Sequence, residues 1–160
     1  MTVIYNVLKE IGLYGWPPFL RDRWFIMALV AGPICWVLLW LTVMPTFSVE
    51  KNAIWIILLL TIAWYPVLEE MLFRGIVQGA LFAKPWGAKS FAGLSVANGI
   101  TSLLFVMAHL WYQPATWAVT VIVPSLVYGF FRDRFLNIYP CIILHAFYNG
   151  GFVTFNLLAQ

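Results

Sequence analysis

Five long apolar stretches, separated by short polar breaks, dominate the pattern of hydrophobic and polar positions along the chain. Each stretch meets or approaches the roughly 20 residues that a helix needs to cross the hydrocarbon core of a bilayer. The runs are continuous, whereas the strands of a membrane β-barrel alternate apolar and polar residues over about ten positions. We therefore predict an all-α fold, a polytopic transmembrane helical bundle of about five spans. The stretches cover residues 24–46, 52–83, 90–111, 114–131 and 136–158.

The segment before the first stretch has a different pattern. Lys9 and Glu10 interrupt its apolar residues and no clear cleavage region follows, so we do not interpret it as a signal peptide. Its aromatic residues and the pair Pro17 and Pro18 predict a short amphipathic piece that lies along the membrane interface. We expect residues 1–160 to form one transmembrane domain, with residues 1–23 as its interfacial segment.

The composition supports the same class of protein. Of the 160 residues, 63% are hydrophobic and 9% are charged, whereas about a quarter of the residues of a soluble protein are charged. The formal net charge of +3 is small and no cluster of Lys and Arg accompanies it, which argues against a nucleic-acid partner. Cys35 and Cys141 lie in separate apolar stretches without His or Cys at ligand spacing, so we interpret both as packing residues.

The basic residues predict the orientation of the spans. If five spans are present, seven of the nine basic residues fall on one side of the membrane, Lys51 falls on the other, and Arg74 lies within a span. The positive-inside rule then places the N-terminus in the cytoplasm and the C-terminus outside. The seven residues are Lys9, Arg21, Arg23, Lys84, Lys89, Arg132 and Arg134.

Small residues recur at four-residue spacing in the second and third stretches. Such stripes let two helices approach closely in lipid, so we expect the second and third spans to pack against each other. The residues are Gly75, Gly79 and Ala83 in the second stretch, and Gly93, Ala97 and Thr101 in the third.

Charged residues interrupt the second stretch, in the sequence WYPVLEEMLFRG. An ionised group at this depth costs about 3 kcal/mol unless it is paired or wetted. On a helix Glu70 and Arg74 share a face, which favours an ion pair, whereas Glu69 is rotated by about 100° and is free for another partner. Pro66 lacks a backbone donor, so it is expected to kink the span and to open space for water beside the acids.

The two histidines of the chain also lie in apolar stretches, and Asn149 follows His145 by one helical turn. At a rise of 1.5 Å per residue, Glu69 and His145 lie about 20 Å and about 18 Å from the cytoplasmic side. His109 lies about 30 Å from that side unless its helix starts later, near Gly93. Because intramembrane polar groups are costly, we expect these residues to form a common site.

Three motifs carry a family resemblance. The sequences EEMLFRG, FVMAH and HAFYN resemble the Glu-Glu-x-x-x-Arg, Phe-x-x-x-His and His-x-x-x-Asn motifs of the CAAX protease and bacteriocin-processing family, also called the Abi family. Its members are glutamate-type intramembrane endopeptidases. The motifs occur in the expected order within residues 52–158. Family members are usually longer, so the chain resembles a minimal member, of which the JDVT-CTERM sorting type is one example.

The resemblance implies a catalytic role for four residues. Glu69 corresponds to the general base and His109 to its partner, and the two activate a water molecule for attack on a peptide bond. His145 and Asn149 correspond to the groups that stabilise the oxyanion of the intermediate, because both side chains can donate hydrogen bonds.

Three further residues are expected to support or bind at the site. Glu70 and Arg74 either form a structural ion pair, or orient the site and meet a substrate carboxylate; the sequence leaves both interpretations open. Phe105, one turn before His109, is interpreted as the packing residue that sets the position of that histidine. Two His and two Glu could ligate zinc as a cofactor, but no His-Glu-x-x-His spacing occurs and the motifs lie on three predicted helices. We therefore expect no cofactor.

The sequence thus predicts an endopeptidase that cleaves near the C-terminus or the membrane-proximal part of a hydrophobic or lipidated protein. The resemblance implies CAAX-like substrates, maturing peptides or C-terminal sorting tails, and a location in the bacterial cytoplasmic membrane in contact with lipid. A bacteriocin-immunity or peptide-binding membrane protein is the alternative. A proton or ion pathway ranks below both, because the sequence shows no repeat of broken helices.

Overall fold

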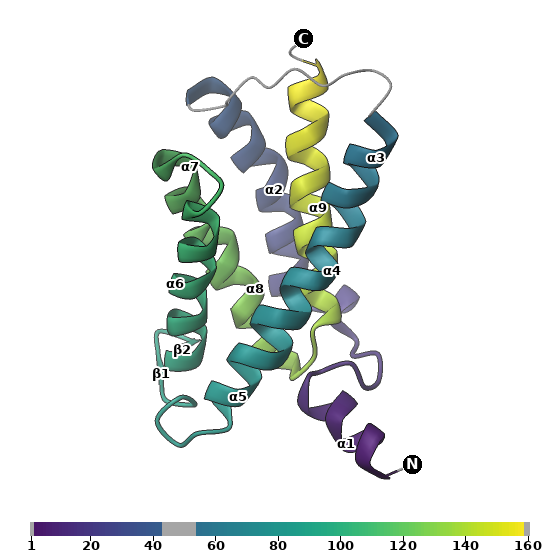
Figure 1. Cartoon of the computed structure of the whole chain (residues 1–160), viewed down its shortest axis with the longest axis vertical. Coiled ribbons are helices and arrows are strands. Elements are labelled where there is room, and N and C mark those ends of the chain that lie inside the picture. The colour runs from purple at the N-terminus through teal and green to yellow at the C-terminus, as the bar shows by residue number, and fades with distance from the viewer. Residues whose placement is uncertain (1, 43–53, 159–160) are drawn as a thin grey trace.

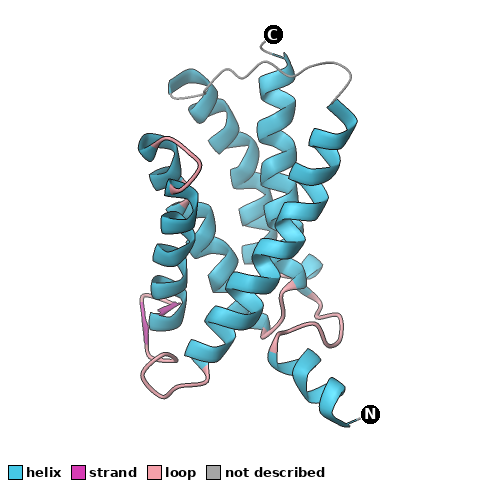
Figure 2. Ribbon diagram, in the orientation of Figure 1, coloured by secondary structure: helices cyan, strands magenta, loops and turns pink. Residues whose placement is uncertain are grey.

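The computed structural model describes residues 2–42 and 54–158, and almost all of them are helical (Figures 1 and 2). This confirms the all-α prediction, apart from one small hairpin. The helices are α1 (Thr2–Glu10), η1 (Phe19–Arg21), α2 (Arg23–Thr42), α3 (Ile54–Leu58), η3 (Leu59–Trp64), α4 (Tyr65–Glu70), η4 (Met71–Gln78), α5 (Gly79–Phe82), α6 (Val96–Leu110), α7 (Ala115–Thr120), α8 (Ile122–Phe135) and α9 (Tyr139–Leu158). The hairpin strands are β1 (Ser90–Phe91) and β2 (Leu94–Ser95).

Two helices of the described part are long and apolar enough to cross a membrane. They are Ile54–Phe82, with 29 residues, and Ala115–Phe135, with 21 residues. Arg23–Leu38 and Val96–Leu110 are shorter apolar helices. The prediction of five spans is therefore not confirmed, whereas two spans of the described part are supported. Lys51 and the predicted span ends at residues 43–46 and 52–53 lie outside the described residues.

The third apolar stretch was expected to be helical from residue 90, and this is wrong for its first six residues. Ala92 and Gly93 have φ of 51° and 84°, and these left-handed conformations form a two-residue turn that pairs Ser90 with Ser95. Helix α6 begins only afterwards, where Ser95 Oγ accepts a hydrogen bond of 2.9 Å from the Asn98 backbone N–H. The later start lowers His109 by about 9 Å and removes the mismatch in depth.

The long helix that carries the charged cluster is interrupted twice by π-helical turns. η3 precedes α4, and η4 follows it directly after Glu70. The N–H of Tyr65 donates to the carbonyl of Leu60, five residues earlier, in place of the usual partner four residues earlier. π-Helical turns often mark functional sites in helices, and here they flank the two glutamates.

Helix α9 lies between α2, α8 and the long helix, and α6 packs against α8 and η4 (Figure 1). A cluster of buried aromatic and aliphatic side chains joins η1 to α2, α8 and α9. Its buried members are Phe19, Phe25, Tyr128, Phe131, Cys141 and Leu144. Cys141 is thus a core residue, as its apolar surroundings predict, whereas Cys35 is exposed.

The stripe of glycines in the long helix does not contact α6 as expected. A Cβ atom at Gly75 would lie 3.1 Å from the carbonyl oxygen of Ile11, and one at Gly79 would lie 3.3 Å from that of Glu10. The stripe therefore accommodates the backbone of Glu10 and Ile11. The four-residue spacing alone could not show which segment packs against the glycines. The second and third stretches do pack together, but through Phe73 and Phe105, whose ring centroids are 5.0 Å apart.

The N-terminal segment is tied to the bundle. Helix α1 projects from the lower end in Figure 1, and residues 10–15, here called the strap, run across that end. The Ile138 backbone N–H donates to Gly12 O at 2.9 Å, and Asn137 Nδ2 donates to the carbonyls of Tyr14 and Gly15 at 3.2 Å each. The strap is thus bound to the turn between α8 and α9.

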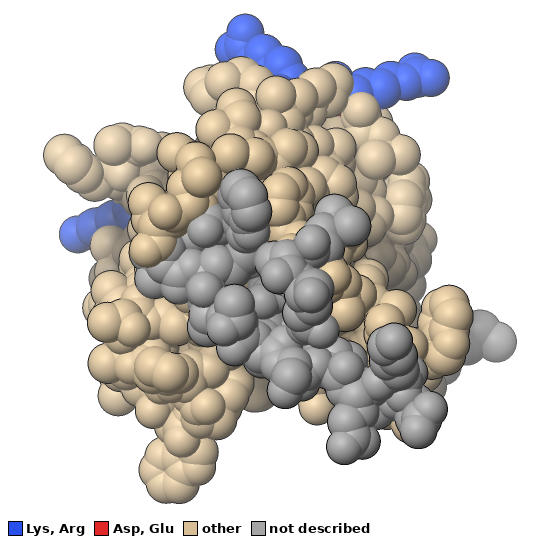
Figure 3. Space-filling view, turned by 90° about the horizontal axis from the view of Figure 1, so that it is seen from above, with Lys and Arg blue, Asp and Glu red and all other residues tan. Residues whose placement is uncertain are grey.

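The two ends of the bundle differ in charge. Helix α1, the loop after α5 and the end of α8 gather at the lower end, whereas α9 ends at the opposite one (Figure 1). Among the described residues, no Asp or Glu is visible in the view from above, and Lys and Arg project only beyond its rim (Figure 3). At the lower end Arg134 Nη2 contacts Asp22 Oδ2 at 2.7 Å.

Candidate active site

Glu70 and Arg74 form a buried ion pair at the centre of the bundle. Arg74 Nε lies 3.2 Å from Glu70 Oε2, and both side chains are 0% exposed. Arg74 Nη2 also donates to Ser125 on α8, to Oγ at 2.6 Å and to the carbonyl at 2.9 Å. The pair predicted from the four-residue spacing is therefore present, and α8 supplies two further hydrogen bonds to Arg74.

His145 lies between the two glutamates. Its Nδ1 is 2.8 Å from Glu70 Oε1, and its Nε2 is 3.8 Å from Glu69 Oε2. An ionised carboxylate only accepts hydrogen bonds, so Nδ1 carries a hydrogen and Nε2 faces Glu69. The separation of 3.8 Å is too long for a direct hydrogen bond. Both Nε2 and Glu69 therefore keep bonding capacity for a third group.

The two adjacent glutamates have different surroundings. The Glu69 side chain is 24% exposed, and its Oε2 is buried without a hydrogen-bond partner. Glu70, by contrast, is completely buried and bound by Arg74 and His145. Glu69 is thus the carboxylate that remains available to another molecule, as the rotation of about 100° between consecutive helical residues predicts.

His109 is held by the backbone of its own helix. Its Nδ1 lies 2.9 Å from the carbonyl oxygen of Phe105, which fixes Nδ1 as the donor and leaves the lone pair on Nε2 in the neutral ring. The Phe105 ring lies 4.4 Å from the His109 ring and 6.0 Å from the His145 ring. No hydrogen bond or ion pair joins His109 to Glu69 in the part of the chain that the structure describes. His109 instead lies near the other site residues through ring packing, because the Phe105 ring lies near both histidine rings.

Asn149 bonds to the long helix. Its Nδ2 donates to the carbonyl oxygen of Thr61 at 3.0 Å. In the π-helical pattern of η3 that carbonyl would accept from residue 66, which is a proline and has no N–H. Asn149 thus replaces the donor that Pro66 lacks, and it retains a second amide hydrogen. The expected kink at Pro66 takes the form of this π-helical turn.

Sequence reasoning missed three residues that shape the site. Tyr128 stacks on His145 with ring centroids 5.0 Å apart and an interplanar angle of 17°, and Ser125 and Arg132 bond to Arg74. Aromatic residues are frequent throughout the chain, so nothing in the sequence distinguishes Tyr128. In the sequence, Arg132 and Arg134 resemble the other basic residues of the polar breaks, which indicate only the orientation of the spans.

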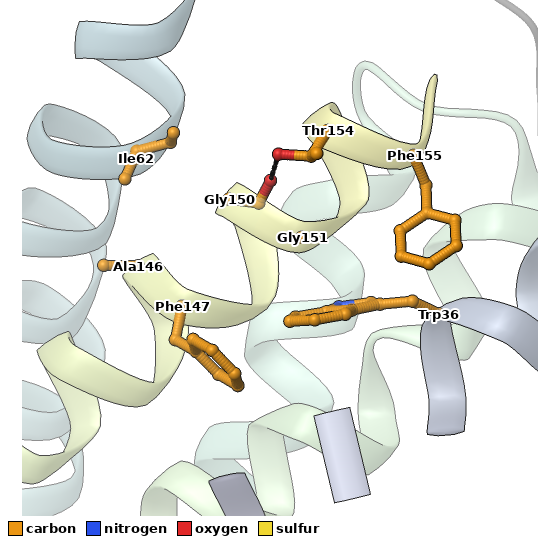
Figure 4. Close-up of a pocket in the computed structure, with 8 residues that line it drawn as sticks. All are labelled: Trp36, Ile62, Ala146, Phe147, Gly150, Gly151, Thr154 and Phe155. Atoms are coloured by element: carbon orange, nitrogen blue, oxygen red, sulfur yellow. Dashed lines mark hydrogen bonds between the residues drawn. The ribbon is translucent and has the colours of Figure 1, made fainter. Parts of the chain in front are cut away.

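An apolar groove of about 460 Å³ adjoins the site between α2, η3 and α9 (Figure 4). Its lining residues Ala146 and Gly150 follow His145 and Asn149 along α9, but no site residue lines the groove itself. The hydroxyl of Thr154 donates to the Gly150 carbonyl at 2.8 Å, which leaves a largely apolar wall. The lining residues are Trp36, Ile62, Ala146, Phe147, Gly150, Gly151, Thr154 and Phe155.

Comparison with known proteins gives one family match. Residues 51–151 match the model of the family described as type II CAAX prenyl endopeptidase, Rce1-like. No curated protein and no solved structure gives a significant match to the chain. The matched range includes all three motifs and every residue predicted for the site.

Proposed function

Because the chain belongs to the Rce1-like family of type II CAAX prenyl endopeptidases, we propose that it hydrolyses peptide bonds within the membrane with Glu69 as the general base. Its family makes it an integral membrane protease. The observation that carries the glutamate mechanism is the contrast between the two acids. Glu70 is completely buried and paired, whereas Glu69 is accessible and faces the free nitrogen of His145.

A water molecule between Glu69 and the histidines would be the nucleophile. Water attacks a peptide bond slowly until a positioned base takes its proton. Glu69 can accept that proton, and Nε2 of His109 has a lone pair that can orient the same water. Among the described residues no hydrogen bond joins His109 to Glu69, so a water or substrate molecule would have to bridge these two side chains.

His145 and Asn149 are proposed to stabilise the oxyanion. Since Nδ1 of His145 donates to Glu70, its Nε2 can donate to an oxyanion only when the ring is doubly protonated. The second amide hydrogen of Asn149 is available because the first is bound to Thr61. Both donors come from one face of α9, which favours a common target.

For Glu70 and Arg74 we propose a structural role in which they hold His145. Both side chains are 0% exposed. Arg74 is bound to Glu70 and to Ser125, and its Nη1, which has no hydrogen-bond partner, is buried, so a substrate carboxylate could reach it only if the helices moved apart. The interpretation as a substrate contact is therefore the weaker one.

Hydrophobic or lipidated proteins are the proposed substrates, and the apolar groove between α2, η3 and α9 supports this choice. A chain embedded in the bilayer could enter from the side and place apolar groups against Phe147, Phe155 and Trp36. We further propose a bacterial cytoplasmic membrane with the N-terminus inside. Helix α1, the loop after α5 and the end of α8 contain basic residues. These segments lie at the same end of the bundle, which supports this orientation (Figure 1).

The test is co-expression of the protein with tailed membrane proteins, followed by intact-mass measurement of those proteins. A farnesylated CAAX peptide and an unmodified peptide with a hydrophobic C-terminal helix serve as purified probes. We expect a truncated product with wild type that is lost with Glu69→Gln. A probe that stays intact with both proteins but co-purifies with them would instead favour the binding or immunity function.

A further inference from the structure

We propose that Arg132 is a positioning residue for the catalytic carboxylate of Glu69, because it joins the N-terminal strap to the helix that carries Glu69. This inference rests on the proposed function. Arg132 lies near the end of α8 and touches none of the groups proposed to react. Its effect would therefore be transmitted through Arg74, and the contacts of both arginines can be followed one by one.

Arg132 is a buried arginine whose hydrogen bonds go to backbone carbonyls. Its side chain is 5% exposed. Nε donates to the carbonyl of Arg74 at 3.0 Å, and Nη2 donates to the carbonyl of Glu10 at 2.8 Å. No ion pair joins Arg132 to a carboxylate among the described residues. A buried charge without an ionic partner is costly, so its two fixed acceptors are the groups that stabilise it.

The two acceptors belong to segments that are far apart in the sequence. The Arg74 carbonyl is in η4, the π-helical turn directly after Glu69 and Glu70. The Glu10 carbonyl begins the strap, which passes close to the same helix at Gly79. A Cβ atom at Gly79 would lie 3.3 Å from Arg132 Nη2 and 3.3 Å from Glu10 O. Arg132 therefore links the strap to η4 by hydrogen bonds to the carbonyls of Glu10 and Arg74 beside Gly79, a contact here called the joint.

From this joint a continuous series of contacts leads to Glu69. Arg132 holds the backbone of Arg74, and Arg74 Nε holds Glu70 Oε2 at 3.2 Å. Glu70 Oε1 then holds Nδ1 of His145 at 2.8 Å, and Nε2 of His145 faces Glu69. Since catalytic geometry is sensitive to displacements of about 1 Å, a loosened joint would misplace His145 relative to Glu69.

Two substitutions loosen the joint in different ways, and each has a matched control. Arg132→Lys keeps the charge, but one ammonium group cannot replace a guanidinium fork that reaches two separate carbonyls. Its control is Arg134→Lys on the same helix, where Arg134 binds Asp22 instead. Gly79→Ala crowds the joint, and its control is Gly99→Ala, because no atom lies within 4 Å of a Cβ at Gly99.

The first readout does not depend on a substrate. The chain has two histidines, so NMR of the protein labelled at histidine nitrogens resolves both rings and shows which nitrogen is protonated. We expect Arg132→Lys and Gly79→Ala to shift the His145 signals and to leave those of His109 in place, while both controls resemble wild type. Unchanged His145 signals in both variants would overturn the inference, whether or not the protein proves to be a protease.

The second readout is the cleavage of the farnesylated CAAX peptide in vesicles. We expect kcat to fall on the order of 10-fold in Arg132→Lys and Gly79→Ala, with KM and the fraction of folded protein unchanged. A normal kcat together with a lower melting temperature would show that Arg132 only supports the fold. If wild type does not cleave the peptide, the proposed substrate class fails, and the NMR comparison still decides on Arg132.

Discussion

Replacing both members of the Glu70–Arg74 pair should destabilise the protein no more than replacing either one alone. Both side chains are 0% exposed and 3.2 Å apart, so water can neither screen their attraction nor solvate the charge left by a single substitution. Breaking a buried pair on one side costs about 3–5 kcal/mol because the other charge stays buried without its partner, so removing that charge as well should add little further cost. We therefore expect Glu70→Gln and Arg74→Gln each to cost about 3 kcal/mol of unfolding free energy.

The double substitution Glu70→Gln with Arg74→Gln should cost less than the sum of the single ones. The assay is reversible unfolding of the four proteins in mixed micelles, monitored by tryptophan fluorescence, which completes a double-mutant cycle. The coupling should approach about 3 kcal/mol, since the partners from α8 and α9 remain in place. Additive costs within about 0.5 kcal/mol would refute the assignment as a coupled structural pair.

Three further predictions concern separate parts of the molecule. Asn149→Ala should lower stability by about 1–3 kcal/mol in the same unfolding assay, because it leaves the carbonyl of Thr61 without a donor. Adding Pro66→Ala restores a backbone N–H and should recover part of this loss, and no recovery would disprove the explanation. Although burial disfavours its charged form, hydrogen bonds from Arg134 and from backbone N–H groups hold the pKa of Asp22 below its ordinary value of 3.8. Ionised Asp22 should therefore contribute to the stability of the fold at neutral pH, and thermal melts should show this contribution lost as the pH falls below about 4 and through the lowered pKa. Asp22→Asn should remove this pH dependence of the melting temperature. Gly150→Leu should fill the groove and raise KM for the farnesylated peptide while the melting temperature is retained, and an unchanged KM would remove the groove from substrate binding.

Contacts within one helix were the part of the site that the sequence could predict. Glu70 and Arg74 meet because residues four apart share a helical face, whatever the rest of the fold does. The closeness of Glu69 and His145 followed from counting residues along two continuous spans. This count failed for His109, because the turn at Ala92 and Gly93 delays the start of α6.

Contacts between helices depend on rotation and on gaps that hydropathy does not encode. The stacking of Tyr128 on His145 requires one particular rotation of α8, and many other aromatic residues have the same local pattern. The bond between Asn149 and Thr61 exists only because η3 is π-helical near a proline. The sequence indicates only that Arg132 is a basic residue in a polar break between two apolar stretches. In the structure Arg132 is buried and bound to the strap.

The most direct test of the central claim is the single-turnover rate of wild type and Glu69→Gln on one probe, the farnesylated CAAX peptide, with enzyme in excess in vesicles. Glutamine keeps the size of the side chain but cannot take a proton, so we predict a fall of about 100-fold or more. An unchanged melting temperature would show that the fold is intact. Cleavage by Glu69→Gln at close to the wild-type rate would contradict the assignment of Glu69 as the base.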